Sequence, residues 1–127
     1  DLEVEDAYVI RAARYGHACA FELDDSAYLE SGGIWTRGDS TARIALTSDM
    51  PRVALDITAG PVPVSVTLRM GEWASDAALA AGQRRRIEVP TGGVLSVRTK
   101  GRFRPADFDR TSKDGRPLGA RLEFPNP

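Results

Sequence analysis

Apolar and polar residues alternate along most of this chain. In the segment 52–58, Val53, Leu55 and Ile57 fall on one side, and mainly polar or small residues fall on the other. The segment 62–70 repeats this pattern. A side-chain period of two is typical of a β-strand with one buried face. The pattern predicts strands at 6–14, 17–23, 43–47, 52–58, 62–70, 84–89, 94–99 and 119–124.

Turn-forming residues separate these segments. They occur at Gly16, 59–61, 81–82, 90–93 and 114–115. Short strands punctuated at about every 8–12 residues are typical of a β-sandwich or jelly roll. We therefore predict an all-β, antiparallel β-sandwich with a jelly-roll-like arrangement, in one domain over residues 1–127. The segment 74–81 is the helix candidate, with a strand and a loop as its alternative.

The inward positions of these strands form the predicted core. Its members are Val9, Phe21, Leu23, Ile44, Leu46, Val53, Leu55, Ile57, Val64, Val66, Leu68, Ile87, Val89, Leu95, Val97, Leu118 and Leu122. Cys19 has apolar neighbours and is also expected to pack in the core. As the single cysteine, it excludes an intramolecular disulfide and a zinc site with several cysteines.

Composition is that of an ordinary globular domain. The chain has 127 residues, of which 42% are hydrophobic and 28% charged, with a net charge of −1. No apolar run approaches the ~18 residues that a membrane-spanning helix needs, so we expect no membrane insertion. The chain begins at Asp1 rather than methionine, and we expect a mature form or an excised domain.

Charge is divided unevenly along the chain. Residues 84–121 carry eleven basic and four acidic side chains, whereas residues 1–83 carry six basic and thirteen acidic. The two parts should attract each other in one sandwich, through surface ion pairs of about 0–1 kcal/mol each. The alternative is a basic face for an anionic ligand. The run 84–86 is all arginine, but few aromatic residues lie near it, so we predict no nucleic-acid partner.

Catalytic signatures are weak. His17 is the only histidine and would have to be the base of any Ser–His–Asp triad, but no G-x-S-x-G segment accompanies it. Sequence places no two of the eighteen acidic residues in a common cleft. We therefore predict that the chain is not an enzyme. A small hydrolase acting on glycan or peptide is a further hypothesis, and it requires a cleft that holds two acidic side chains.

Two segments carry candidate binding residues. Trp35 and Arg37 lie in the glycine-rich stretch 32–38. An aromatic ring there could stack on a sugar, and the arginine could donate to hydroxyl or carboxylate groups. The alternative is a core tryptophan that enters a strand after a glycine turn. The acidic residues Asp24, Asp25 and Glu30 are candidate ligands for a structural calcium ion, with a solvated turn as the alternative.

The C-terminal segment is the most informative. Pro105 is followed by Ser112, Asp114, Arg116 and the pair Leu118-Gly119. Asp114 and Arg116, two residues apart, share a face on extended backbone and can form a charged pair that clamps the loop. Alternatively, Arg104, Asp114 and Arg116 form a ligand site at the loop end of the sandwich.

These residues resemble the closing motif of bacterial β-sandwich accessory domains, carbohydrate-binding-module-like in kind, that are associated with surface-glycan glycosyltransferases. The segment Tyr28–Gly38 resembles an earlier phrase of the same domains, with Ile34 where an aromatic residue is expected. Ala120 likewise replaces an expected valine. Together the two segments cover roughly a quarter of the chain, and the middle resembles the family only in its strand pattern.

The resemblance implies a function and a place. We expect a non-catalytic carbohydrate-binding-like accessory module of a bacterial cell-surface glycan system, outside the cytoplasm, with a glycan or polysaccharide as partner. The expected ligand-binding residues are Trp35, Arg37, Arg104, Asp114 and Arg116. No cofactor is expected beyond the calcium considered above. The alternative is a structural or protein–protein interaction β-sandwich domain without a small-molecule ligand.

Overall fold

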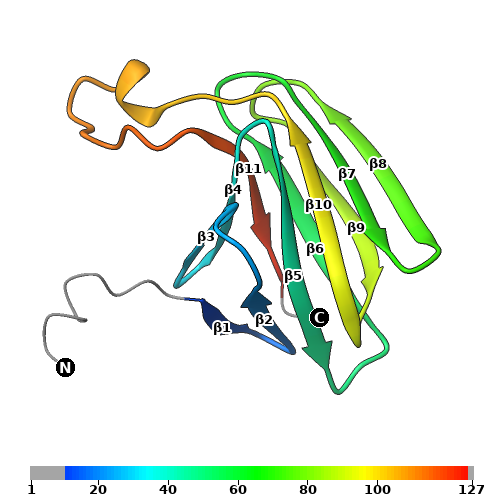
Figure 1. Cartoon of the computed structure of the whole chain (residues 1–127). Coiled ribbons are helices and arrows are strands. Elements are labelled where there is room, and N and C mark those ends of the chain that lie inside the picture. Colours follow the sequence, from blue (N-terminus) through cyan, green and yellow to red (C-terminus); the bar gives the residue numbers. More distant parts are fainter. Residues whose placement is uncertain (1–10, 126–127) are drawn as a thin grey trace, which may run out of the picture.

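The computed structural model describes residues 11–125, which form two antiparallel sheets packed face to face (Figure 1). One sheet, called sheet A, has the strand order β1-β2-β5-β10-β7-β8, and sheet B has the order β3-β4-β11-β6-β9. The strands are β1 (Ala12–Tyr15), β2 (Ala18–Glu22), β3 (Ala27–Glu30), β4 (Gly33–Arg37), β5 (Ser40–Ser48), β6 (Arg52–Ala59), β7 (Val64–Met70), β8 (Trp73–Leu79), β9 (Arg84–Pro90), β10 (Gly93–Lys100) and β11 (Leu118–Glu123). A short 3-10 helix, η1 (Pro105–Asp107), precedes β11. The predicted antiparallel β-sandwich is confirmed.

The strand pairing is that of a jelly roll. Strands β4 to β11 form four nested antiparallel pairs, β4 with β11, β5 with β10, β6 with β9 and β7 with β8. Successive pairs alternate between sheets B and A, so that the nested ribbon rolls into a sandwich. Strands β1 and β2 extend sheet A, and β3 extends sheet B.

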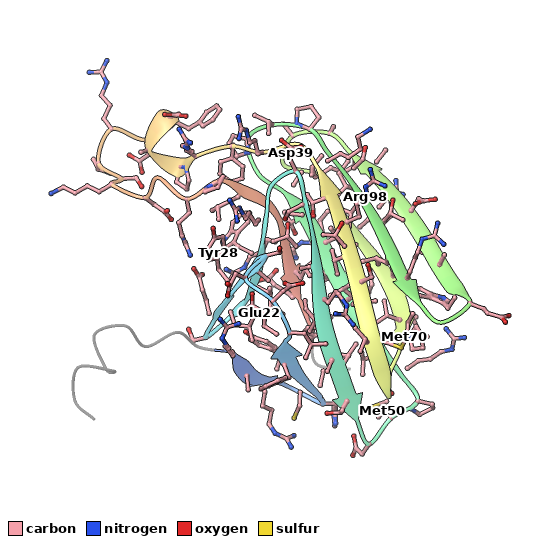
Figure 2. The ribbon with its side chains drawn as sticks, in the orientation of Figure 1. Glu22, Tyr28, Asp39, Met50, Met70 and Arg98 are labelled. Atoms are coloured by element: carbon pink, nitrogen blue, oxygen red, sulfur yellow. The ribbon has the colours of Figure 1, made fainter. Side chains whose placement is uncertain are left out.

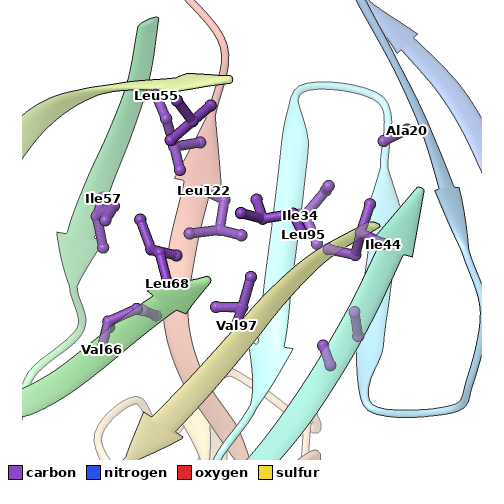
Figure 3. Close-up of a cluster of buried hydrophobic side chains, with 14 of the residues drawn as sticks. Ala20, Ile34, Ile44, Leu55, Ile57, Val66, Leu68, Leu95, Val97 and Leu122 are labelled. Carbon is purple, nitrogen blue, oxygen red and sulfur yellow. The ribbon is translucent and has the colours of Figure 1, made fainter. Parts of the chain in front are cut away.

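The core lies between the inner faces of the two sheets (Figure 3). Ile34 and Leu122 from sheet B meet Leu68 and Val97 from sheet A, and all four are completely buried. The predicted core residues that are confirmed are Ile44, Leu46, Val53, Leu55, Ile57, Val64, Val66, Leu68, Val89, Leu95, Val97, Leu118 and Leu122. Ile87 is only partly buried against this core, and Val9 lies outside the described residues.

The orientation predicted for β2 is wrong. Phe21 is 50% exposed and Leu23 is 40% exposed. The inward positions of this strand are instead Ala18, Ala20 and Glu22. Both faces of this strand carry apolar residues, and the small alanines are the ones that fit beside the buried ring of Tyr15. Cys19 shares the outer face and is only partly buried, so its predicted place in the core is also wrong.

Three segments differ from the simplest prediction. The helix candidate is the strand β8, in which Ala77 and Leu79 alternate with exposed residues, so the alternative interpretation is confirmed. Strands β3 and β4 were not predicted: β3 alternates over only four residues, and in β4 the alternation is broken because Gly33 and Ile34 are both buried. The tight turn between them brings Gly33 against the backbone of Leu122, where a Cβ atom would lie 2.5 Å from the carbonyl oxygen.

Candidate ligand-binding site

A long excursion separates the last two strands. Residues 101–117, called the arm, leave the sandwich after β10 and return as β11 (Figure 1). Gly101 begins the arm with a φ of 116°, a conformation that favours glycine. The base of the arm is closed by two backbone hydrogen bonds between Phe103 and Leu118, of 2.9 and 2.8 Å. Pro105 begins η1, where its fixed φ and missing N–H cause no loss.

Asp114 and Arg116 form the charged pair that their spacing predicts. Arg116 Nε donates to Asp114 Oδ1 over 2.9 Å, and Nη2 donates to Oδ2 over 2.7 Å. The same carboxylate accepts the backbone N–H of Arg116 over 3.0 Å. These bonds hold the pKa of Asp114 below its usual range and raise that of Arg116. The returning half of the arm is therefore fixed by its own side chains.

Arg116 also ties the arm to sheet B. Its Nη2 lies 3.1 Å from Glu30 Oε2, and its guanidinium carbon lies 4.9 Å from the centre of the Tyr28 ring. Glu30 Oε1 accepts a second bond, of 3.0 Å, from Arg121 on β11. Together, Asp114, Arg116, Glu30 and Arg121 make an alternating chain of charges, which we call the arm clamp. The loop clamp predicted from sequence is thus present, and it extends to two further strands.

Aromatic rings surround the arm clamp. Tyr28 and Trp35 are direct cross-strand partners on the outer face of sheet B, and Arg121 lies beside Trp35 in register. The Trp35 ring meets Phe103 edge-on, with 5.6 Å between ring centres, and Phe103 in turn meets Phe108 at 6.2 Å. Phe103 is buried, whereas Phe108 is 57% exposed. The row runs from the sheet onto the arm, and Figure 2 labels Tyr28 below the arm.

The structure brings together three of the five predicted ligand-binding residues. Trp35, Asp114 and Arg116 belong to one surface, connected through Glu30 and Arg121. Arg37, at the end of β4, and Arg104, just before η1, are both exposed. Within residues 11–125, no side-chain hydrogen bond or ion pair joins either of them to the other three.

The three predicted calcium ligands are not gathered at one point. Asp25 pairs with Arg11 over 2.6 Å, and Asp24 accepts the backbone N–H of Ser26. Glu30 belongs to the arm clamp and faces arginines. Within the described part of the chain, no three His, Cys, Asp or Glu side chains lie together as a metal would require. The bond from the Ser26 N–H to the Asp24 carboxylate is typical of an aspartate in a turn, which was the alternative to calcium binding.

Several residues of this surface were not predicted as a site. Tyr28, Phe108 and Arg121 were not predicted as ligand-binding residues, and Glu30 was predicted only as a calcium ligand. For Arg121 the sequence held a signal, because an outward-facing arginine in an otherwise buried final strand needs an acidic neighbour. The pairing with Glu30 spans 91 residues, and no local spacing reveals it.

A cleft lies at the other end of the sandwich, where Figure 2 labels Met50. This shallow cleft of ≈ 250 Å³ is lined by His17, Arg52, Arg86 and the stacked rings of Tyr15 and Phe124, among others. His17 is exposed, and its Nδ1 is 3.8 Å from an Asp49 carboxylate oxygen. In the described residues no serine or cysteine hydrogen-bonds to this histidine.

Comparison with known proteins gave no match: no protein-family model, no curated protein and no solved structure proved similar to this chain. Among residues 11–125, no helix has the length and apolar character needed to cross a membrane.

Proposed function

We propose that this chain is a non-catalytic, carbohydrate-binding accessory module of a bacterial cell-surface glycan system, acting outside the cytoplasm. Its glycan site is the surface at the base of the arm. The resemblance of the segments 28–38 and 103–119 to glycan-associated accessory domains motivates the proposal, and the jelly-roll sandwich is compatible with it.

The observation that carries the proposal is that exposed Phe108 and the partly exposed rings of Tyr28 and Trp35 lie beside the arm clamp, with buried Phe103 packed between Trp35 and Phe108. Sugar rings present C–H faces that pack on aromatic rings, and hydroxyl groups that hydrogen-bond to charged side chains. Charge-assisted hydrogen bonds are stronger than neutral ones. The arm clamp already holds its guanidinium and carboxylate groups in place. Binding a glycan there would therefore cost the protein little side-chain entropy.

The test is a microarray of bacterial surface glycans, probed with three forms of the chain. Phe108 is 57% exposed, so Phe108→Ala should fold normally and weaken binding about tenfold. The matched control is Phe21→Ala, which removes a similarly exposed ring, 50% against 57%, from the outer face of sheet A. Binding of neutral glycans that is indifferent to Phe108, or absent for every glycan, would contradict the proposal.

One observation favours the alternative of a protein–protein interaction domain. Phe21, Leu23 and Val94 are 50%, 40% and 38% exposed on the side of the molecule away from the arm clamp. Large exposed apolar side chains are enriched where proteins meet. Under this alternative, the glycan array would be silent and Phe21→Ala, rather than Phe108→Ala, would abolish association with a protein partner.

A further inference from the structure

The outer faces of the two sheets differ in how their charges are used. On sheet B, three of the five outward arginines in the described residues have an acidic partner: Arg84 lies 3.7 Å from Glu123, Arg86 lies 2.7 Å from Asp56, and Arg121 lies 3.0 Å from Glu30. The pairs Arg86–Asp56 and Arg121–Glu30 join the basic segment 84–121 to the acidic segment 1–83, as the uneven charge of the chain predicts. The protein itself therefore neutralises three arginines of this face, while Arg37 and Arg52 form no ion pair within residues 11–125.

The outer face of sheet A carries cations without such partners. Arg43 of β5, Arg69 of β7, and Arg98 and Lys100 of β10 are all exposed. None of these four side chains forms an ion pair with any residue in the described range 11–125. We call these four residues the basic strip. Figure 2 labels Arg98, and its strand β10 is an inner strand of sheet A, between β5 and β7.

The register places the members of the basic strip close together. Arg43 and Arg69 both pair with Ser96, one from each side. Strands are about 5 Å apart, and alternate residues along a strand about 7 Å apart. The backbones of neighbouring cations are therefore about 7–10 Å apart. Such spacing allows a linear anion to contact several of them at once.

Few acidic side chains lie near the basic strip. In the described strands, Asp76 of β8 is the only acidic residue at an outward position of sheet A, and it lies two strands from Arg98 and diagonally across from Arg69. Asp39, in the turn before β5, lines a depression with Arg98 and Lys100, but its carboxylate accepts the Gly101 N–H over 2.8 Å and lies 3.8 Å from Arg102. Between the cations stand small hydroxyl side chains. They are Thr41, Ser65, Thr67 and Ser96. The strip is thus flat, positive and rich in hydrogen-bonding groups.

We infer that the basic strip is a second binding site, separate from the arm, for a polyanionic polysaccharide. The guanidinium group matches carboxylate, sulfate and phosphate in a bidentate geometry, and the interleaved hydroxyls suit sugar hydroxyl groups. The preference for polysaccharide over other polyanions rests on the proposed function and on the side chains present. Single-stranded nucleic acid would need several aromatic stacking platforms among the cations. In the described part of sheet A the one outward ring is Phe21 of β2, which lies beyond Arg43 at one end of the strip. A membrane surface would need a cluster of apolar side chains to insert. On β7 and β10 the one exposed apolar side chain beside the strip is Val94.

The experiment measures binding to dextran sulfate and polygalacturonate by biolayer interferometry. Unmodified dextran is the neutral control, and a DNA duplex and anionic lipid vesicles represent the competing classes. The variant R43Q/R69Q/R98Q removes three cations of the strip. Its matched control, R52Q/R85Q/R110Q, removes three exposed arginines elsewhere and leaves the total charge of the two variants equal.

The wild-type chain should bind both anionic polysaccharides and not dextran, and the affinity should fall steeply with salt. The strip variant should lose about tenfold or more in affinity with a shallower salt dependence, and the control should stay within about threefold. The inference is overturned if both variants lose affinity equally, if the strip variant loses none, if DNA or vesicles bind as tightly, or if the wild type does not bind. Loss of polyanion binding in Phe108→Ala alone would overturn this inference while supporting the arm site.

Discussion

Arg116→Ala should loosen the arm and destabilise the whole fold. The side chain makes a bidentate pair with Asp114, an ion pair of 3.1 Å with Glu30 and a cation–π contact with Tyr28. Because it is 36% exposed, solvent screens each contact. Exposed ion pairs contribute about 0.2–1 kcal/mol each, and an exposed cation–π contact contributes about 0.5–1 kcal/mol. The free energy of unfolding should therefore fall by about 1–3 kcal/mol.

Urea unfolding measures this loss, and hydrogen exchange locates it. Arg110→Ala is the matched control, because Arg110 lies exposed in the same arm and such substitutions change stability by about 0.5 kcal/mol at most. In Arg116→Ala, the Ala106 amide that donates to Asp114 O should exchange faster. The reasoning is refuted if Arg116→Ala matches Arg110→Ala in stability and leaves this exchange unchanged.

Acid should act on the same contact. Because the pKa of Asp114 is lowered in the native state, the pair is fully stabilising above the usual pKa of an unfolded carboxyl group and is lost as pH falls through the lowered value. The exchange difference between wild type and Arg116→Ala should therefore disappear in strong acid.

Three further outcomes follow from the core. Burial raises the pKa of Glu22, so stability declines as pH rises from the unfolded carboxyl pKa to the raised native value. Glu22→Gln keeps an acceptor for the Ala27 N–H, and thermal melts should show a higher Tm than wild type at pH 7 and no difference below pH ~4. In Gly119→Ala the new Cβ would lie 2.5 Å from Thr99 Cγ2, so the free energy of unfolding from urea titration should fall by about 1–3 kcal/mol. The control is Gly115→Ala, where the new Cβ faces open space and the free energy of unfolding should change by no more than about 1 kcal/mol. Leu122→Ala should cost about 2–5 kcal/mol in the same titration, because Leu122 is completely buried; a loss under about 1 kcal/mol would contradict the core assignment.

The fold could be predicted where one strand face is apolar and the other polar. In β6, Val53, Leu55 and Ile57 point into the core as their spacing predicts. In β2 the same reasoning failed, since both faces are apolar and size decides between them. The alanines fit beside Tyr15, and the larger Phe21 is left outside. Alternation gives the period of a strand but not which face is buried.

One part of the candidate site could likewise be predicted from the sequence, and another part could not. The pair of Asp114 and Arg116 follows from their separation of two residues, and the structure confirms it. The partners that complete the arm clamp, Glu30 and Arg121, come from strands that meet only through the nested pairing of the jelly roll. Local patterns therefore predicted the centre of the clamp, and only the tertiary fold supplied its connection to sheet B.

The most direct test of glycan binding at the arm uses the two tryptophans of the chain. Trp35 lies at the proposed site, and Trp73 begins β8 in the other sheet, so its indole serves as an internal reference. Indole N–H resonances are followed by NMR during titration with a panel of bacterial surface polysaccharides. If the arm binds glycan, at least one polysaccharide shifts the Trp35 resonance and leaves that of Trp73 unchanged. Glycan binding at the arm is contradicted if no polysaccharide shifts Trp35, or if binding shifts only Trp73.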